Sequence, residues 1–202
     1  MRASLGRVGI VLFLFGATVG SALDAIHTYS GTTAYPQPVA FRMAWWTPLL
    51  FGFAGLSTGL AYPIVERLRR RPIAKDATLA RVTGSFALFA LLYLASGFLP
   101  ASNAVKLAVL LAGDVALFAT VAKTREALAL AACAAVIGPA TEIVLVAQGA
   151  FRHLQPDVFG IPIWLPALYA AGSFAIGLSG KALARSFEPR TITPSSAARS
   201  LP

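Results

Sequence analysis

The sequence is poor in the residues on which enzymes and soluble domains depend. Only 12% of its 202 residues are charged and eight are acidic, with one cysteine and two histidines, whereas 57% are hydrophobic. A soluble domain of this size needs a more polar surface, so the composition excludes one. It predicts a polytopic membrane protein with little chain left over for a separate soluble domain.

The scarcity of cysteine and histidine limits the chemistry that the chain can perform. Cys133 stands alone in an apolar run, so it cannot form an intramolecular disulfide or a cysteine-rich metal site. His27 and His153 are too few for most metal centres. The sequence has no nucleophile elbow and no glycine-rich phosphate loop before Lys-Ser or Lys-Thr. We therefore expect no enzymatic activity, no metal and no cofactor.

Long apolar runs are what the sequence has in place of these residues. A helical span needs about 20 apolar residues, and backbone groups inside a bilayer must be paired, which favours helices over strands. No segment suggests a strand. We predict an all-α transmembrane domain over residues 1–187 and a flexible cytoplasmic tail over 188–202. The predicted helices cover about 8–27, 45–65, 79–99, 104–121, 127–149 and 163–184.

The distribution of positive charge predicts the topology. If the N-terminus is inside, fourteen of the seventeen lysines and arginines lie on the inner side, and only Arg42, Lys106 and Arg152 lie outside. The positive-inside rule then places both termini in the cytoplasm. Topology and anionic lipid headgroups explain the net charge of +9 better than nucleic acid does. Arginine outnumbers lysine 13 to 4, as in GC-rich bacterial genomes, so we expect a bacterial inner membrane protein.

The first apolar segment has an alternative reading as a secretory signal. Arg2 and Arg7 give it a basic start, and Ser21-Ala22 offers small residues for cleavage. Its apolar run of about nineteen residues is long for a signal core, and its removal would disturb the charge balance. We therefore expect the segment to be retained as a span.

Two GxxxG patterns predict close helix packing. Gly16 and Gly20 form one in the first segment, and Gly55 and Gly59 form the other in the second. Glycines at this spacing let a neighbouring backbone approach closely. The close contact could lie within one protomer or between protomers. Because the glycine faces offer a surface for self-association, we expect a homo-oligomer.

Polar residues inside the predicted spans are candidates for a site, because a charge there costs about 2.5–3.5 kcal/mol on insertion scales. Asp114 and Glu142 lie at similar depth on consecutive helices, so they could line one cavity together with Thr141 and Gln148. We predict lipid contacts at these four residues. Asp24 and His27 share a helical face, and we expect them to form a helix end beside water.

Three interpretations of the two buried carboxyls remain open. They could be protonated groups that donate hydrogen bonds to backbone carbonyls. They could form the polar floor of an apolar cavity that receives a lipid hydroxyl. They could instead form a proton or cation path, in which case the chain is a small proton-coupled transporter using Asp114 and Glu142. A purely structural role through the glycine faces is a further alternative.

Four motifs resemble those of the Insig (insulin-induced gene) family. Two of them open and close the second segment, one precedes the last segment, and one opens it. They are Ala44-Trp45-Trp46-Thr47-Pro48, Gly59-Leu60-Ala61-Tyr62-Pro63, Gln155-Pro156-Asp157-Val158-Phe159 and Trp164-Leu165-Pro166. The openings Trp46-Thr47-Pro48 and Trp164-Leu165-Pro166 also look alike, but a duplication of three helices would pair the second segment with the fifth, so we infer no repeat.

The resemblance implies a six-helix membrane sensor without enzymatic activity. Animal Insigs lie in the endoplasmic reticulum, bind oxysterols, hold the escort protein Scap and promote degradation of HMG-CoA reductase. Ala122 here stands where the family has a partner-binding aspartate, just before Lys123, so a Scap-type partner is not expected. What the resemblance leaves is an apolar cavity reached from the bilayer, for a sterol or a diacylglycerol-like lipid with a small headgroup.

Overall fold

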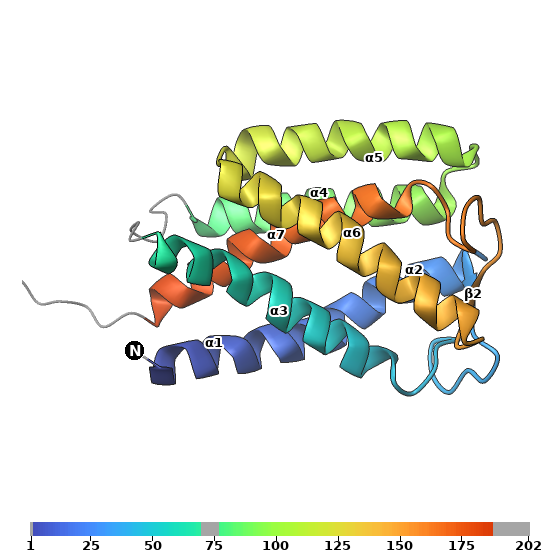
Figure 1. The fold of residues 1–202 in the computed structure, drawn as a ribbon, viewed down its shortest axis with the longest axis horizontal. Helices are drawn as coiled ribbons and strands as arrows, with labels where there is room; N and C mark the ends of the chain where they lie inside the picture. The colour runs from blue at the N-terminus through green and yellow to red at the C-terminus, as the bar shows by residue number, and fades with distance from the viewer. Residues whose placement is uncertain (1, 70–76, 188–202) are drawn as a thin grey trace, which may run out of the picture.

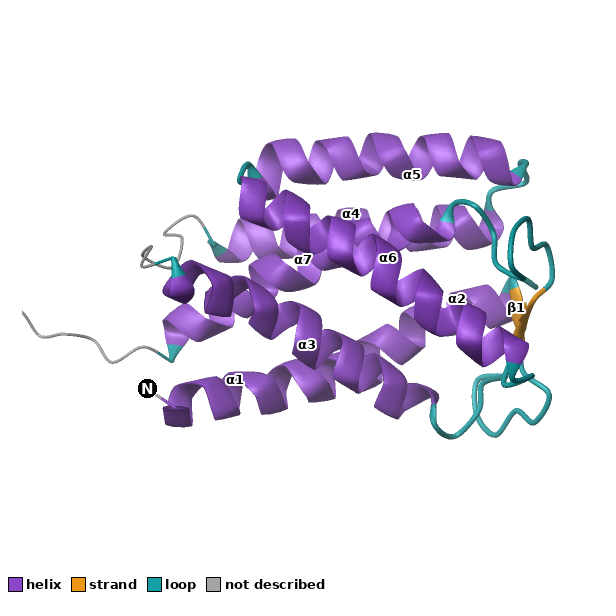
Figure 2. Cartoon of the chain, in the orientation of Figure 1, coloured by secondary structure: helices purple, strands orange, loops and turns teal. Residues whose placement is uncertain are grey.

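The computed structural model describes residues 2–69 and 77–187, and its helices form six rods that run between two ends of the molecule (Figures 1 and 2). The first rod is continuous through a π-helical turn, and the fourth rod ends in another. The helices are α1 Arg2–Phe15, η1 Gly16–Gly20, α2 Ser21–Tyr29, α3 Thr47–Leu68, α4 Leu79–Phe98, α5 Asn103–Leu117, η2 Phe118–Ala122, α6 Arg125–Ala147 and α7 Leu165–Ser186.

The predicted all-α membrane fold is confirmed. The observed helix bounds differ from the predicted ones by three residues or fewer, except that the first helix starts at Arg2 instead of residue 8. Five of the six rods are long and apolar enough to cross a membrane, namely Leu5–Tyr29, Thr47–Leu68, Leu79–Phe98, Asn103–Thr120 and Arg125–Ala147. The described N-terminal end, the end of α3 and the end of α7 lie at the same end of the molecule (Figure 1). The cytoplasmic location of that end stays a prediction, and the predicted tail at 188–202 lies outside the described residues.

None of the predicted apolar segments forms a strand, but two short strands lie in the links between them. Strands β1, Thr33–Ala34, and β2, Arg152–His153, pair antiparallel, with Thr33 opposite His153 and Ala34 opposite Arg152. A strand of two residues carries no alternation of apolar and polar side chains from which it could be recognised. The pair ties the loop before α3 to the loop before α7 at the end opposite the N-terminus (Figure 2).

Helix α7 is the central element, which explains why it is absent from the five apolar spans. It contacts α1, α3, α4, α5 and α6, and Figure 1 shows it between the other rods. A helix enclosed by protein does not need a lipophilic surface, so it can consist largely of alanine, glycine and serine. It also carries Lys181, buried and paired with Glu66 of α3, as a charge inside a bundle requires.

Local signals at the helix starts fall into two kinds. Helices α4, α5 and α6 begin after Thr78, Ser102 and Thr124, whose hydroxyls each accept a backbone N–H of the first turn. Helices α3 and α7 have no side-chain cap. They carry Pro48 and Pro166 in the first turn, where a helix does not use the missing N–H.

The chain contains an internal repeat that the sequence motifs only hinted at. Each copy begins with the end of a helix, followed by a glycine in the left-handed region (φ +74° and +73°) and a short strand. An isolated β-bridge comes next, and it encloses a second residue in the left-handed region (φ 49° and 50°). In each copy a tryptophan is then the N-cap of a 22-residue helix. The backbone angles of the two tryptophans are nearly equal (φ −82°, ψ −13° and φ −80°, ψ −14°). Equivalent residues are Gly31 and Gly149, Ala40 and Val158, Phe41 and Phe159, and Trp46 and Trp164.

The two copies pack on each other reciprocally. Gly59 and Tyr62 of α3 occupy the same places in the repeat as Gly177 and Gly180 of α7. Gly180 lies against the carbonyl oxygen of Gly59, and Gly177 lies against the ring of Tyr62. Such an exchange of contacts is what a two-fold relation produces. The repeat unit is therefore a helix pair, α2–β1–α3 and α6–β2–α7, with α4 and α5 between the copies, and not a set of three helices.

Candidate functional site

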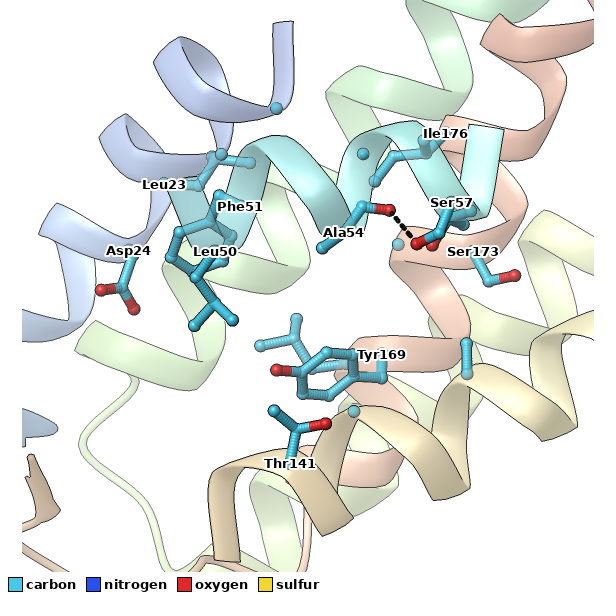
Figure 3. A pocket seen from close by; sticks show the side chains of 18 of the residues that line it. Leu23, Asp24, Leu50, Phe51, Ala54, Ser57, Thr141, Tyr169, Ser173 and Ile176 are labelled. Carbon is cyan, nitrogen blue, oxygen red and sulfur yellow. Dashed lines mark hydrogen bonds between the residues drawn. The ribbon is translucent and has the colours of Figure 1, made fainter. Parts of the chain in front are cut away.

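A cavity of about 680 Å³ lies between the two repeats. Residues of α1, η1, α2, α3, α4, α6 and α7 line it, together with residues of the loops around β1 and β2. Among the described residues, none from α5 lines it. Figure 3 shows Asp24, Thr141 and Tyr169 around one open space, although they belong to three different helices.

The walls of the cavity are mainly apolar. One of the few polar groups, the Tyr169 hydroxyl, owes its position to a glycine on α6. Gly138 lies directly against the ring of Tyr169, so the tyrosine can lie flat on α6. Glu142 follows Gly138 by one helical turn and shares its face. The Tyr169 hydroxyl therefore reaches Glu142 Oε1 and donates a hydrogen bond of 2.7 Å.

Polar side chains gather at the end of the cavity beneath the β1–β2 pair. Glu142 Oε2 lies 2.8 Å from His153 Nε2 of β2. Across the cavity, Asp24 of α2 accepts a 2.9 Å hydrogen bond from the Tyr35 hydroxyl. Burial, with the Asp24 carboxyl as the second cause, raises the pKa of Tyr35, so this hydroxyl keeps its proton and acts as the donor.

Two polar atoms at this end have no hydrogen-bond partner in the described structure. They are Thr33 Oγ1 and His153 Nδ1, and both residues are at least nine-tenths buried and line the cavity. Thr33 and His153 are opposite one another in the β1–β2 pair. Buried polar atoms are rarely left unpaired, so such a pair needs an explanation.

A second polar cluster joins α2, α4 and α5 beside the cavity. Ser96 Oγ donates to the Tyr93 carbonyl at 2.8 Å, so it accepts from His27 Nε2, also at 2.8 Å. The His27 ring stacks on Tyr93 with ring centres 4.4 Å apart. Lys106 is buried and donates to the Ser96 carbonyl at 2.8 Å. These contacts satisfy the polar groups of three helices where water is scarce.

The structure brings two of the four predicted lipid-contact residues into the cavity. Thr141 and Glu142 line it, although the Thr141 hydroxyl already donates to its own helix at Ile137. Asp114 is on α5, half-buried and with Oδ1 unpartnered, outside this cavity. Gln148 is the exposed C-cap residue of α6 and also lies outside it. Lipid contact at these four positions stays a prediction.

Sequence reasoning missed most of the polar end of the cavity. Asp24 and His27 share a face as predicted, but both are buried and line the cavity instead of facing water. Their place inside the first apolar segment was the signal available for them. Tyr169 gave a weaker signal, one helical turn beyond the Trp-Leu-Pro motif. Nothing in the sequence places Thr33 beside His153, because that contact depends on the pairing of two distant loops.

The motif residues shape the loop before α7 and the α3–α7 contact. Asp157 Oδ2 accepts from Asn103 Nδ2 at 2.7 Å and from the Ile163 backbone at 2.9 Å. Trp164 Nε1 donates to Asn103 Oδ1 at 2.9 Å, which ties this loop to the start of α5. The Tyr62 hydroxyl lies 3.0 Å from Ser173 Oγ of α7. Other motif residues, Trp45, Trp46, Pro48, Pro63, Pro156 and Pro166, lie at or near helix starts, in the loop before α7 or within α3.

The four glycines of the GxxxG patterns lie where the first rod crosses α3. Gly16 faces the Phe51 backbone, and Gly55 faces the Leu12 carbonyl and Gly16. Gly20 faces the Phe51 side chain, and Gly59 faces the Leu12 side chain.

Within the described ranges, no group of three or more histidines, cysteines, aspartates and glutamates could hold a metal ion.

The long apolar helices, with a mainly apolar cavity between them, define a helical integral membrane protein. The chain matches the family model described as Insulin-induced protein (INSIG) over residues 7–198, and it belongs to the Insig family. It is 30% identical to the Insulin-induced gene 1 protein of Danio rerio over 186 residues, 90% of this chain and 74% of that protein. It is 28% identical to the Insulin-induced gene 2 protein of Gallus gallus over 180 residues, 87% of this chain and 80% of that protein.

The fold matches solved structures of a bacterial member of this family. The structure of the mycobacterial Insig homolog MvINS from Mycobacterium vanbaalenii has a TM-score of 0.80 and 27% identity, covering 91% of this chain and 97% of that one. A cross-linked trimer of MvINS gives a TM-score of 0.79 and 28% identity, with the same coverage. The suspected family is thereby confirmed.

Proposed function

We propose that this chain is an Insig-like lipid-binding membrane protein of the sensor type. It holds one neutral lipid with a small headgroup, a sterol or a diacylglycerol-like molecule, in the cavity between its repeats. The observation that carries this proposal is the cavity of about 680 Å³, apolar along its walls and polar at one end. Pockets for small molecules have about 300–1,000 Å³ and a few placed polar groups.

The lining supports access from the bilayer. Phe53 and Ser57 on α3, and Cys133 and Ile137 on α6, line the cavity and are also exposed. Because these residues belong both to the cavity lining and to the protein surface, we infer that the cavity opens between α3 and α6. In a membrane such an opening faces acyl chains, so a lipid can enter without crossing water.

The polar contacts of the bound lipid come from Thr141 and Glu142 of the sequence-based set, because these two line the cavity. Asp114 and Gln148 do not line the cavity, so they could contact only a lipid bound outside the cavity. The alternative of a proton-coupled transporter depends on a path shared by Asp114 and Glu142. No described contact or cavity joins the two carboxyls, so we do not propose transport, and the proposal assigns the chain no catalytic step.

The proposal includes a homo-oligomer in a bacterial inner membrane, without a Scap-type partner. The cross-linked MvINS trimer supports the oligomer, and the arginine-rich composition supports the location. Ala122 at the family's partner-binding position argues against Scap-type binding. Cross-linking in native membranes followed by denaturing electrophoresis should give a discrete higher species, and a monomer alone would contradict the oligomer.

The test of the proposal is mass spectrometry of lipids that survive gentle purification of the full chain, compared with the bulk membrane extract. One neutral lipid enriched to about one copy per chain is expected. A co-purified lipid profile identical to the bulk membrane would overturn the assignment and leave only the fold relation.

A further inference from the structure

We propose that the polar end of the cavity is a headgroup subsite specific for a free hydroxyl, built by Thr33 and His153. It accepts neutral lipids that carry an unmodified alcohol, and it discriminates against the esters, ketones and phosphates of the same lipids. This inference rests on the proposed function, because it names the headgroup chemistry of the lipid that the cavity holds.

The charges around the cavity disfavour anionic headgroups. The described lining contains two carboxyl groups, Asp24 and Glu142, and no lysine or arginine. Its only basic residues are His27, which is bonded to Ser96, and His153, which is bonded to Glu142. A phosphate placed here would lie near two acidic groups with no free cation to balance it, which is costly in a low-dielectric interior.

The contacts of Glu142 fix which atom of His153 is available. Glu142 Oε1 accepts from Tyr169, and Oε2 lies at hydrogen-bond distance from His153 Nε2. In the ion-pair arrangement of Glu142 and His153 the carboxylate can only accept, which places the proton of this bond on Nε2. In the neutral imidazole the other nitrogen, Nδ1, is then an acceptor. Nδ1 is buried without a hydrogen-bond partner among the described residues, so it requires a donor from the ligand.

Thr33 supplies the opposite requirement. Its hydroxyl is also buried and has no partner within the described part of the chain, and Thr33 is opposite His153 in the strand pair. This hydroxyl has a proton to donate, so it needs an acceptor. The two residues together therefore call for a group that donates to one and accepts from the other.

A hydroxyl is the small lipid headgroup that meets both requirements. It donates its proton to His153 Nδ1 and accepts the proton of Thr33 Oγ1. Ester and ketone oxygens only accept, and an ammonium group only donates, so each of these leaves one buried atom unsatisfied. A site built around the hydrogen bonds of a hydroxyl discriminates strongly against analogues that lack it.

The experiment compares three lipids that differ only at one position, 1,2-dioleoylglycerol, its 3-acetate and its 3-phosphate, on the purified full chain by native mass spectrometry. We expect the acetate and the phosphate to bind at least about tenfold more weakly than the alcohol. Cholesterol against cholesteryl acetate gives the same comparison on a sterol body. The Thr33→Val variant, which keeps the shape but loses the hydroxyl, should weaken alcohol binding by about 2- to 10-fold, because the lipid hydroxyl loses the hydrogen bond that Thr33 donates to it.

Two further variants serve as controls. Thr33→Ser keeps a hydroxyl at this position and should bind the alcohol about as well as the unmodified chain does. Thr47→Val makes the same change at a fully buried threonine outside the cavity, and the preference should persist. If Thr33→Val does not fold, the comparison of alcohol and acetate on the unmodified chain decides alone. Equal binding of alcohol and acetate would overturn the subsite but not the proposed function, whereas no binding of any probe would overturn the proposed function itself.

Discussion

At the scale of single residues, the difference between Glu142 and Asp114 shows what the sequence can and cannot predict. Both are carboxyls at similar depth in apolar segments, which made both of them candidates. Glu142 is on the face of α6 that meets Tyr169 and the cavity, whereas Asp114 is on α5, which does not border the cavity. The sequence reveals a costly residue in a span, but which face meets the cavity depends on how the helices pack.

This difference predicts unequal effects of two conservative changes. Glu142→Gln should reduce the amount of co-purified lipid several-fold, because the amide replaces one of the two carboxyl oxygens that face Tyr169 and His153 with an NH2 donor. Asp114→Asn should leave lipid retention in this cavity unchanged. Quantitative lipid mass spectrometry on the two variants checks both expectations. Equal losses would instead favour the sequence-based prediction that the four polar residues act together.

The buried ion pair between Lys181 and Glu66 gives a second prediction at this scale. Both side chains are largely buried, Lys181 contacts Glu66 Oε1, and Glu66 Oε2 has no hydrogen-bond partner among the described residues. Removal of one member of a buried pair leaves an uncompensated charge, at a cost of about 3–5 kcal/mol. Lys181→Met should therefore lower the thermal unfolding midpoint in detergent markedly.

The matched control for the ion pair removes both charges. The double variant Lys181→Met, Glu66→Leu should recover most of the lost stability, because well-packed apolar residues can replace a buried pair at little cost. A double variant as unstable as the single one would mean that Lys181 acts through its stem or through the Tyr62 ring, which lies 5.6 Å from its ammonium.

At the scale of helices, apolar runs in the sequence were sufficient to place the rods approximately, because lipid contact requires long apolar runs. The same reasoning could not identify α7 as the central helix. Its alanines, glycines and serines are suited to close contact with protein on many sides. The strands were missed because two residues carry no pattern.

The crossing of α3 and α7 predicts a steep effect of one added methyl group. A Cβ at position 180 would overlap the carbonyl oxygen of Gly59, so Gly180→Ala must force the two helices apart, at a cost of about 1–3 kcal/mol. Gly84→Ala in α4 is the matched control, since nothing lies within 4 Å of a Cβ there, and it should be neutral or slightly stabilising. Thermal unfolding of both variants measures the difference. Similar midpoints would contradict the tight α3–α7 crossing.

At the scale of the whole molecule, the repeat explains why a cavity exists at the centre of a small bundle. Two helix pairs pack reciprocally where α3 crosses α7, and at the other end the β1–β2 strands join them. The space between these two contacts is the cavity, and α4 closes part of one side. The two Trp-x-Pro openings were visible in the sequence, but their equivalence depends on backbone angles that no sequence motif displays.

This arrangement predicts that a cross-link between the strands joins the two repeats within one protomer. Ala34 and Arg152 are directly opposite in the antiparallel pair, where Cα atoms are about 5.5 Å apart, within the range of a disulfide. In a Cys133→Ser background, Ala34→Cys with Arg152→Cys should oxidise without forming dimers on denaturing gels, and should raise the unfolding midpoint because a long loop is closed. Ala34→Cys with Leu154→Cys, displaced along the strand, should oxidise more slowly. Faster oxidation of the displaced pair, or only intermolecular dimers from the first, would contradict this register and with it the closed polar end of the cavity.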